Sequence, residues 1–195
     1  MAPSNFALLD PHLNSLLAKL HDESDSQKRS VSAFFILRVL LNKLGLMWAL
    51  SGDYFDWFMR DKSVALDREK AQFCYLMIRI TGAKTVVEVG TSLGVSAIWL
   101  AAAVRDNSED GDRGVVIATE REPEKSAKAK ANWELAGLTK WIKLLEGDVI
   151  ETLRDLHLDD PVDLVLMDIW TPLALPSLKS LTLKMRKGSY TILSF

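Results

Sequence analysis

Residues 82–97 read Gly-Ala-Lys-Thr-Val-Val-Glu-Val-Gly-Thr-Ser-Leu-Gly-Val-Ser-Ala, a β-branched run followed by a turn that holds two glycines. The run at 85–89 is typical of a short central strand, because β-branched side chains suit a pleated surface that is buried on both faces. The turn carries Gly90 and Gly94, and the apolar stretch 96–104 after it predicts a helix. Together these features predict the first strand-turn-helix unit of a parallel sheet.

Strands and helices continue to alternate over more than one hundred residues. Ahead of the first strand, a helix is expected to start after Asp67 and to end at Gly82. The other predicted strands are 115–119, 142–145, 164–167 and 190–193, with helices at 122–136, 149–156 and 176–185. This alternation predicts an α/β fold, a Rossmann-like, doubly wound, mostly parallel sheet with helices on both faces.

The chain before the sheet is helical in pattern. We divide the sequence into an N-terminal helical region at 1–62, which caps the sheet or mediates oligomerisation, and a sheet domain at 63–195. The polar stretch 21–29 predicts a linker between two N-terminal helices. An aromatic cluster at 54–58 is interpreted as a helix packed on the core or, alternatively, as the wall of a substrate pocket or dimer.

The apolar run at 31–50 approaches the length of a membrane span. Arg38, Asn42 and Lys43 interrupt it. A charge near the middle of a spanning helix costs about 2.5–3.5 kcal/mol on insertion scales. We therefore expect no membrane span but a helix that is buried or faces a partner, with peripheral membrane contact as the alternative.

Composition narrows the classes of partner. Lys and Arg number 24 against 26 Asp and Glu, so the net charge of −2 gives no electrostatic case for a nucleic-acid partner. A small neutral or cationic ligand fits this balance better. The single cysteine, Cys74, forms no internal disulfide, and the start of the chain lacks the order of a secretory signal, so a cytoplasmic location is expected.

The glycine turn is the first candidate for ligand binding. In open α/β sheets, ligands bind beyond the carboxyl ends of the strands, where the strand order reverses. Gly90 and Gly94 have the spacing G-x-x-x-G, and Ser92 stands where a dinucleotide site would have glycine, which disfavours a nicotinamide oxidoreductase. The turn and the helix after it suit the methionine carboxylate of S-adenosylmethionine, because helix amino termini offer unpaired N–H groups to anions.

Two acidic residues follow the next two strands. Glu120 directly follows 115–119, where a carboxylate can accept hydrogen bonds from both ribose hydroxyls. The alternative for Glu120 is a solvated charge at a strand end. Asp148 follows the strand 142–145 and either accepts from the adenine amino group or caps the helix that begins at Val149.

With these motifs the chain resembles the catechol and caffeoyl-CoA O-methyltransferases, a family of class I, S-adenosylmethionine-dependent enzymes. The resemblance rests on 82–97, on Glu120, on Gly147-Asp148 and on 163–168, and it spans about 63–193. It implies S-adenosylmethionine as the cofactor. The cofactor-binding residues that we assign are Glu88, Gly90, Thr91, Ser92, Gly94, Ser96, Glu120, Arg121, Asp148, Val149 and Asp168.

The resemblance also implies a divalent cation such as Mg²⁺, with Asp168 as a ligand, and it places Trp170 beside the methyl acceptor; we assign both as catalytic. The alternatives are a strand-end carboxylate paired with a local N–H, and a tryptophan in ordinary core packing. The family pattern has an Asp-Asn pair at the end of the next strand and a lysine base after the metal aspartate. Here Ser194, Phe195 and Thr171 occupy those positions, which counts against a metal site.

The resemblance implies a fold that continues past this last strand with two more strands, and we expect them to be missing here, because the sequence stops at Phe195. We therefore expect an exposed sheet edge, covered by another subunit or by the N-terminal helices, or a truncated or degenerate chain. The predicted function is methylation of a hydroxyl on a small, catechol-like metabolite. The alternative is a catalytically impaired or truncated S-adenosylmethionine-binding domain that acts as an oligomeric partner, in a homodimer formed through the N-terminal helices or the sheet edge.

Overall fold

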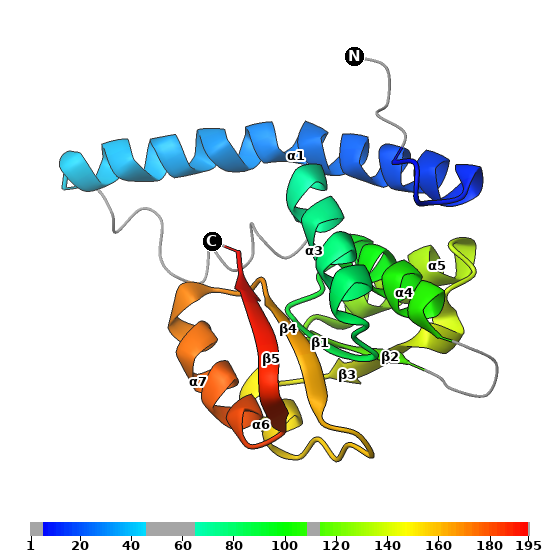
Figure 1. Ribbon diagram of the computed structural model, residues 1–195. Coiled ribbons are helices and arrows are strands. Elements are labelled where there is room, and N and C mark those ends of the chain that lie inside the picture. Colours follow the sequence, from blue (N-terminus) through cyan, green and yellow to red (C-terminus); the bar gives the residue numbers. More distant parts are fainter. Residues whose placement is uncertain (1–5, 46–64, 109–113, 195) are drawn as a thin grey trace.

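The computed structural model describes residues 6–45, 65–108 and 114–194. The aromatic cluster at 54–58 and Phe195 lie outside these residues, as does the predicted boundary at residue 62. The described chain forms a five-stranded parallel sheet in the order β3-β2-β1-β4-β5 (Figure 1). The strands are β1 (Thr85–Val89), β2 (Val115–Glu120), β3 (Ile142–Glu146), β4 (Val162–Met167) and β5 (Met185–Leu193).

Helices cover both faces of this sheet, so the predicted doubly wound α/β fold is confirmed (Figure 1). One core lies between the sheet and the first group of helices, and the second core lies between the sheet and the other group. The first group is α1 (Pro11–Lys43), α3 (Arg68–Thr81), α4 (Val95–Asn107) and α5 (Pro123–Leu135), and the second is α6 (Val149–Arg154) and α7 (Thr171–Thr182).

The last helix and strand begin earlier than predicted. Helix α7 starts at Thr171 rather than at residue 176, because Pro172 suits the first turn of a helix. Pro176 therefore lies inside the helix. Strand β5 starts at Met185 rather than at residue 190, and an irregularity in its pairing with β4, between Val162 and Leu164, accommodates the extra length.

The linker predicted at 21–29 is wrong, because α1 runs through it as one continuous helix. Two polar side chains in that stretch are buried against the rest of the fold. Trp99 Nε1 donates to His21 Nε2 at 3.2 Å, and the backbone N–H of Ala65 donates to Ser24 Oγ at 2.8 Å. The stretch contains no glycine or proline to end a helix, and its two buried polar side chains have partners far away in the sequence. The polar residues therefore continue the helix.

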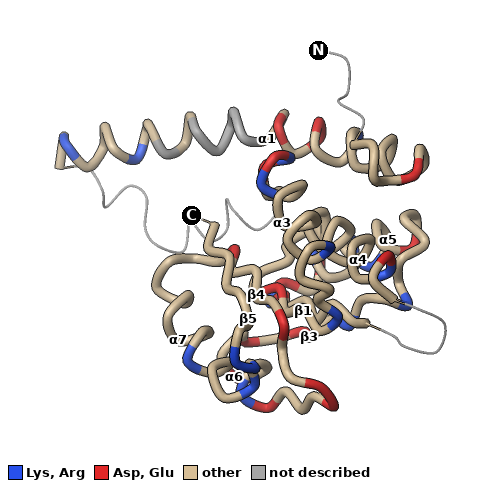
Figure 2. The backbone as a smooth tube through the Cα atoms, viewed as in Figure 1, with Lys and Arg blue, Asp and Glu red and all other residues tan. Residues whose placement is uncertain are grey.

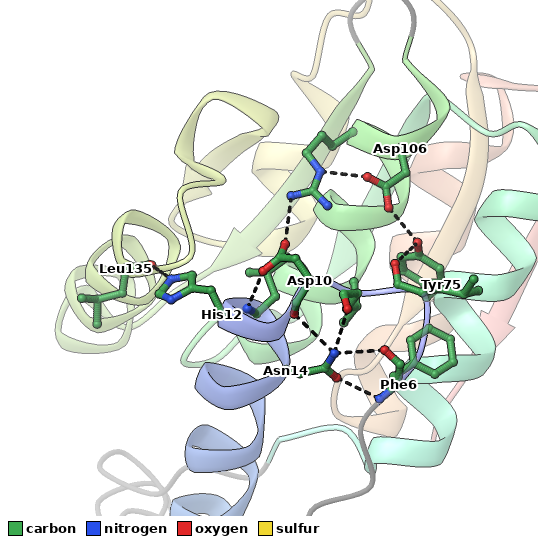
Figure 3. A network of polar contacts seen from close by, with 11 residues as sticks. Phe6, Asp10, His12, Asn14, Tyr75, Asp106 and Leu135 are labelled. Carbon is green, nitrogen blue, oxygen red and sulfur yellow. Dashed lines mark hydrogen bonds and ion pairs between the residues drawn. The ribbon is translucent and has the colours of Figure 1, made fainter.

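The start of α1 is fixed to the sheet domain by a polar network (Figure 3). Asp10 caps α1 by accepting from the backbone N–H of Leu13, and its carboxylate also pairs with Arg105 of α4 at 3.7 Å. The Tyr75 hydroxyl of α3 donates to Asp106 of α4 at 2.7 Å and also lies 3.4 Å from the Leu8 carbonyl, just before α1. His12 Nε2 contacts the Leu135 carbonyl at 2.8 Å. Buried leucines along the same part of α1 belong to the same core as α3 and α4, so this half of the helix packs as part of the sheet domain.

The other half of α1 extends beyond the sheet domain (Figure 1). Its exposed side chains include Ile36, Leu37, Val39 and Leu40. None of the helices in the described residues is long and apolar enough to cross a membrane. Acidic and basic residues are interspersed over the sheet domain in the view of Figure 2, without a basic stripe.

Replacing Tyr75 with phenylalanine tests the anchor of α1. The hydroxyl donates to a carboxylate, and hydrogen bonds to charged groups contribute about 1.5–3 kcal/mol. We expect Tyr75→Phe to lower the free energy of unfolding by about 1.5 kcal/mol in urea titrations. The matched Tyr190→Phe, at a half-exposed tyrosine, should change it by less than about 0.5 kcal/mol; equal losses would show that the network does not hold the helix.

Candidate active site

The strand order reverses between β1 and β4, and the carboxyl ends of these strands meet there. From β1 the chain adds β2 and β3 on one side of the sheet, and then returns to place β4 and β5 on the other. Gly90 follows β1, and Asp168 follows β4. The backbone N–H of Asp168 donates to Val89 O at 3.1 Å. The glycine turn thus lies at the predicted reversal point.

Both glycines of the turn are required by packing within the protein. Gly90 has φ +90°, and a Cβ there would lie 2.5 Å from the Asp168 carbonyl oxygen. Gly94 has φ +77°, and a Cβ there would overlap the indole ring of Trp133, whose Nε1 donates to Gly94 O at 3.0 Å. The sequence indicated a close approach of backbone to ligand; the structure shows a close approach of backbone to its own neighbours.

The amide groups of the turn are largely used inside the fold. Thr119 receives two of them, through its Oγ1 from Gly90 at 3.0 Å and through its carbonyl from Thr91 at 2.9 Å. The Gly94 amide donates to Thr91 O. The donors left for an anion are those of the first turn of α4, which has no side-chain cap. Ser96, in that first turn, is buried.

Glu120 lies against the turn, so the expected juxtaposition of these two elements is present. Its Oε2 accepts from the Ser92 amide at 2.9 Å, and its Oε1 accepts from the amides of Arg121 and Glu122, each at 2.9 Å. Ser92 has φ +52°, a left-handed conformation that is uncommon for a residue with a side chain. The carboxylate therefore holds the turn in place, and it is not simply a solvated charge.

Glu88 is completely buried at the end of β1, and both of its carboxylate oxygens lack a hydrogen-bond partner. Burial raises the pKa of Glu88 to about 7. The nearby hydroxyls of Ser96 and Thr91 lower the pKa without forming well-aligned bonds, and the negative charges of Asp168 and Glu120 raise it. An unpartnered buried carboxyl is costly, which points to a ligand that supplies the missing partner.

The other predicted contacts with a cofactor sit at the ends of β2 and β3. Asp148 caps α6, since its Oδ1 accepts from the amides of Ile150 at 2.8 Å and Glu151 at 3.2 Å. The capping interpretation is thus confirmed, and a contact with adenine stays a prediction. Val149 is buried, whereas the side chain of Arg121 is exposed and pairs with Glu122.

The two residues assigned as catalytic stand at the end of β4. Asp168 is half-buried. Trp170 precedes α7 as its N-cap residue and is 53% exposed, so the alternative of core packing is wrong. An exposed indole next to the strand ends presents a flat aromatic surface on which an aromatic acceptor can stack.

The residues around Asp168 do not fit a divalent cation. Among the residues that the structure describes, no three His, Cys, Asp or Glu side chains cluster in a way that could hold a metal. Ser194, at the end of β5, accepts a hydrogen bond from the ammonium group of Lys70 at 3.4 Å. The position that would need a further carboxylate or amide oxygen is thus occupied by a hydroxyl paired with a positive charge, which disfavours a cation there.

Sequence reasoning missed Thr119 and Lys70. Thr119 lies directly before Glu120, and its small polar side chain at a strand end was the signal that could have found it. Lys70 stands near the start of an apolar helix, and its partner Ser194 is 124 residues away in the sequence. No local pattern links those two residues.

This arrangement can be compared with known proteins. A family model described as O-methyltransferase matches residues 59–171, more than half of the chain. The chain belongs to the O-methyltransferase family. The family resemblance drawn from the glycine turn, Glu120 and Asp148 is thereby confirmed.

Individual family members give the degree of likeness. A catechol O-methyltransferase of Niastella koreensis is 30% identical over 112 residues, which cover 56% of this chain and 48% of that protein. A catechol O-methyltransferase of Mycobacterium tuberculosis is 30% identical over 105 residues, covering 54% of this chain and 44% of that protein. The chain therefore spans about half the length of these relatives.

Solved structures share the fold. Cofactor-bound Rv0187 from MTB has a TM-score of 0.60 and 26% identity, and covers 67% of this chain and 56% of its own. An O-methyltransferase from Bacillus cereus in complex with SAH has a TM-score of 0.61 and 18% identity, covering 89% and 74%. The O-methyltransferase fold extends over most of the described chain.

Gly94→Ala tests the packing of the turn. A methyl group there would overlap Trp133 and would also impose a left-handed conformation on alanine, which costs about 1–2 kcal/mol by itself. We expect the free energy of unfolding to fall by more than about 3 kcal/mol. Gly137→Ala is the matched control, since Gly137 has φ +67° with nothing within 4 Å of a Cβ, and should cost only about 1–2 kcal/mol. Equal losses would contradict the packing role.

Proposed function

We propose that this chain is an S-adenosylmethionine-dependent O-methyltransferase that acts on a hydroxyl group of a small, catechol-like molecule. The observation that carries the proposal is the buried, unpartnered carboxyl of Glu88 beside the uncapped start of α4. These two groups are complementary to the ammonium and the carboxylate of an α-amino acid. Two relatives described as catechol O-methyltransferases support the acceptor class.

The cofactor would be held by residues of three strand ends. The first turn of α4 and Ser96 would receive the methionine carboxylate, and Glu88 the ammonium group. Glu120 would bind the ribose hydroxyls, with one oxygen still anchored to the backbone of Arg121 and Glu122. Both amide bonds in the Asp148 cap use Oδ1, which leaves Oδ2 for the adenine amino group.

The charge of the site suits this cofactor. The negative charges of Glu120 and Asp168 both act on Glu88, and the sulfonium and ammonium groups of the cofactor are positive. When bound, S-adenosylmethionine supplies an electrophilic methyl group. The protein supplies position, and good alignment of nucleophile and methyl carbon contributes about 7–11 kcal/mol. Trp170 would stack on the acceptor ring, next to Asp168.

The alternative, a domain that only binds S-adenosylmethionine and acts as an oligomeric partner, gains no support from relatives described as O-methyltransferases. Homodimer formation and a cytoplasmic location stay predictions. The exposed apolar half of α1 is the surface through which a dimer would form.

Binding of S-adenosylhomocysteine tests the proposed function. We expect this product to raise the melting temperature, because it binds only the folded chain. Glu120→Ala should weaken the calorimetric affinity at least tenfold, whereas Glu124→Ala, at an exposed glutamate on α5, should leave it unchanged. No binding to the unaltered chain at millimolar ligand would refute the proposal.

The pKa of Glu88 makes the affinity depend on pH. Only the ionised carboxylate pairs with the ammonium group, and this form grows as the pH rises through about 7. We expect the affinity for S-adenosylhomocysteine to rise about tenfold between pH 6 and pH 8. Glu88→Gln should bind more weakly and without this rise; a pH-independent affinity in the unaltered chain would contradict the assignment.

The same shift predicts an opposite effect on stability. The pKa of Glu88 rises from 4.5 to about 7 on folding, so the folded chain holds the proton more tightly than the unfolded chain. The stabilisation is present below pH 4.5 and is lost as the pH rises through 7, by about 3 kcal/mol. Without ligand, Glu88→Gln should therefore be more stable than the unaltered chain at pH 8 in urea titrations. A less stable variant at pH 8 would contradict this account.

A further inference from the structure

Lys70 places a positive charge at the end of the sheet where the acceptor is expected. It is the third residue of α3, and its side chain is half-exposed. The ammonium group donates to Ser194 Oγ at 3.4 Å and pairs with the Asp67 carboxylate at 3.8 Å. An ammonium group carries three donor hydrogens, so with these two partners it can still donate to a further acceptor.

The register of the sheet places Asp168 near Ser194, the partner of this lysine. Met167 of β4 pairs with Leu193 of β5, and the Ser194 amide donates to Met167 O at 2.9 Å. Asp168 and Ser194 therefore follow neighbouring strands, whose axes lie about 4.8 Å apart.

A second observation points from α3 to the same place. Cys74 is one helical turn after Lys70, on the same face of α3. Burial raises the pKa of the Cys74 thiol, and the charges of Glu88 and Asp168 raise it further. The face of α3 that carries Lys70 thus looks toward Asp168.

We propose that the ammonium group of Lys70 holds the acceptor oxygen as an oxyanion and supplies the positive charge that the family pattern assigns to a metal ion. This inference rests on the proposed function. It assigns to α3 a catalytic residue, and it makes the methyl transfer independent of divalent cations. This role of Lys70 explains two observations together. A metal fits poorly beside the ammonium, and Ser194 and Phe195 stand in place of the Asp-Asn pair.

The step balances without another reactant. The acceptor hydroxyl gives its proton to solvent, and the oxyanion that remains pairs with the ammonium of Lys70, which stays protonated throughout. The oxygen lone pair then forms a bond to the methyl carbon as the bond from that carbon to sulfur breaks. A sulfonium and an oxyanion become a neutral thioether and a neutral methyl ether, so the ammonium is released from its partner when the product forms.

Binding of 4-nitrocatechol tests this role directly, because its visible absorption shifts to longer wavelength when a hydroxyl ionises. The 195-residue chain is saturated with S-adenosylhomocysteine in the presence of EDTA and titrated with 4-nitrocatechol at a mildly acidic pH, at which the free ligand is mostly un-ionised. We expect the spectrum of the ionised form on binding. Lys70→Met should weaken this binding at least tenfold and remove the shift, and Lys70→Arg should retain part of it, since the charge is kept.

Lys187→Met is the matched control, because Lys187 is an exposed lysine on β5 near the opposite end of the strand from Ser194. It should bind 4-nitrocatechol as the unaltered chain does, and all variants should keep their affinity for S-adenosylhomocysteine. A full shift in Lys70→Met, a shift that requires added Mg²⁺, or no shift in an unaltered chain that binds S-adenosylhomocysteine would each overturn the role of Lys70. Loss of S-adenosylhomocysteine binding by the unaltered chain would instead refute the proposed function.

Discussion

The site depends on the close contact between the turn after β1 and the backbone that ends β4. Gly90 passes so near the Asp168 carbonyl that no side chain fits between them, and Gly94 meets Trp133 in the same way. These two contacts fix where the turn lies above the sheet. They also fix the direction of α4, whose uncapped first turn then faces the ends of the central strands. The packing of the two glycines thereby positions the backbone N–H groups that would bind an anion.

Glu88 shows the opposite relation, in which function costs stability. A carboxyl group that is fully buried without a partner destabilises the folded chain whenever it is ionised. Its neighbours Glu120 and Asp168 add like charge. Such a group is consistent with a site that binds a cationic ligand, because the ligand supplies the charge and the hydrogen bonds that the protein withholds.

The sequence predicts those parts of the molecule that depend on local patterns. The β-branched runs locate the strands, and the position of Glu120 after β2 follows from the alternation of strand and helix. The continuity of α1 could not be predicted, because His21 and Ser24 look like linker residues until their buried partners are known. The contact between Lys70 and Ser194 depends on strand register across the whole domain.

The central claim is that the turn after β1 and Glu120 form one binding site for an adenosyl amino acid. Amide NMR spectra of the ¹⁵N-labelled chain during titration with S-adenosylhomocysteine test it most directly. The account predicts the largest shift changes at residues 90–97 and 120–122. Changes confined to another surface, such as the cavity lined by Ile80, Arg186 and Lys187, would contradict it.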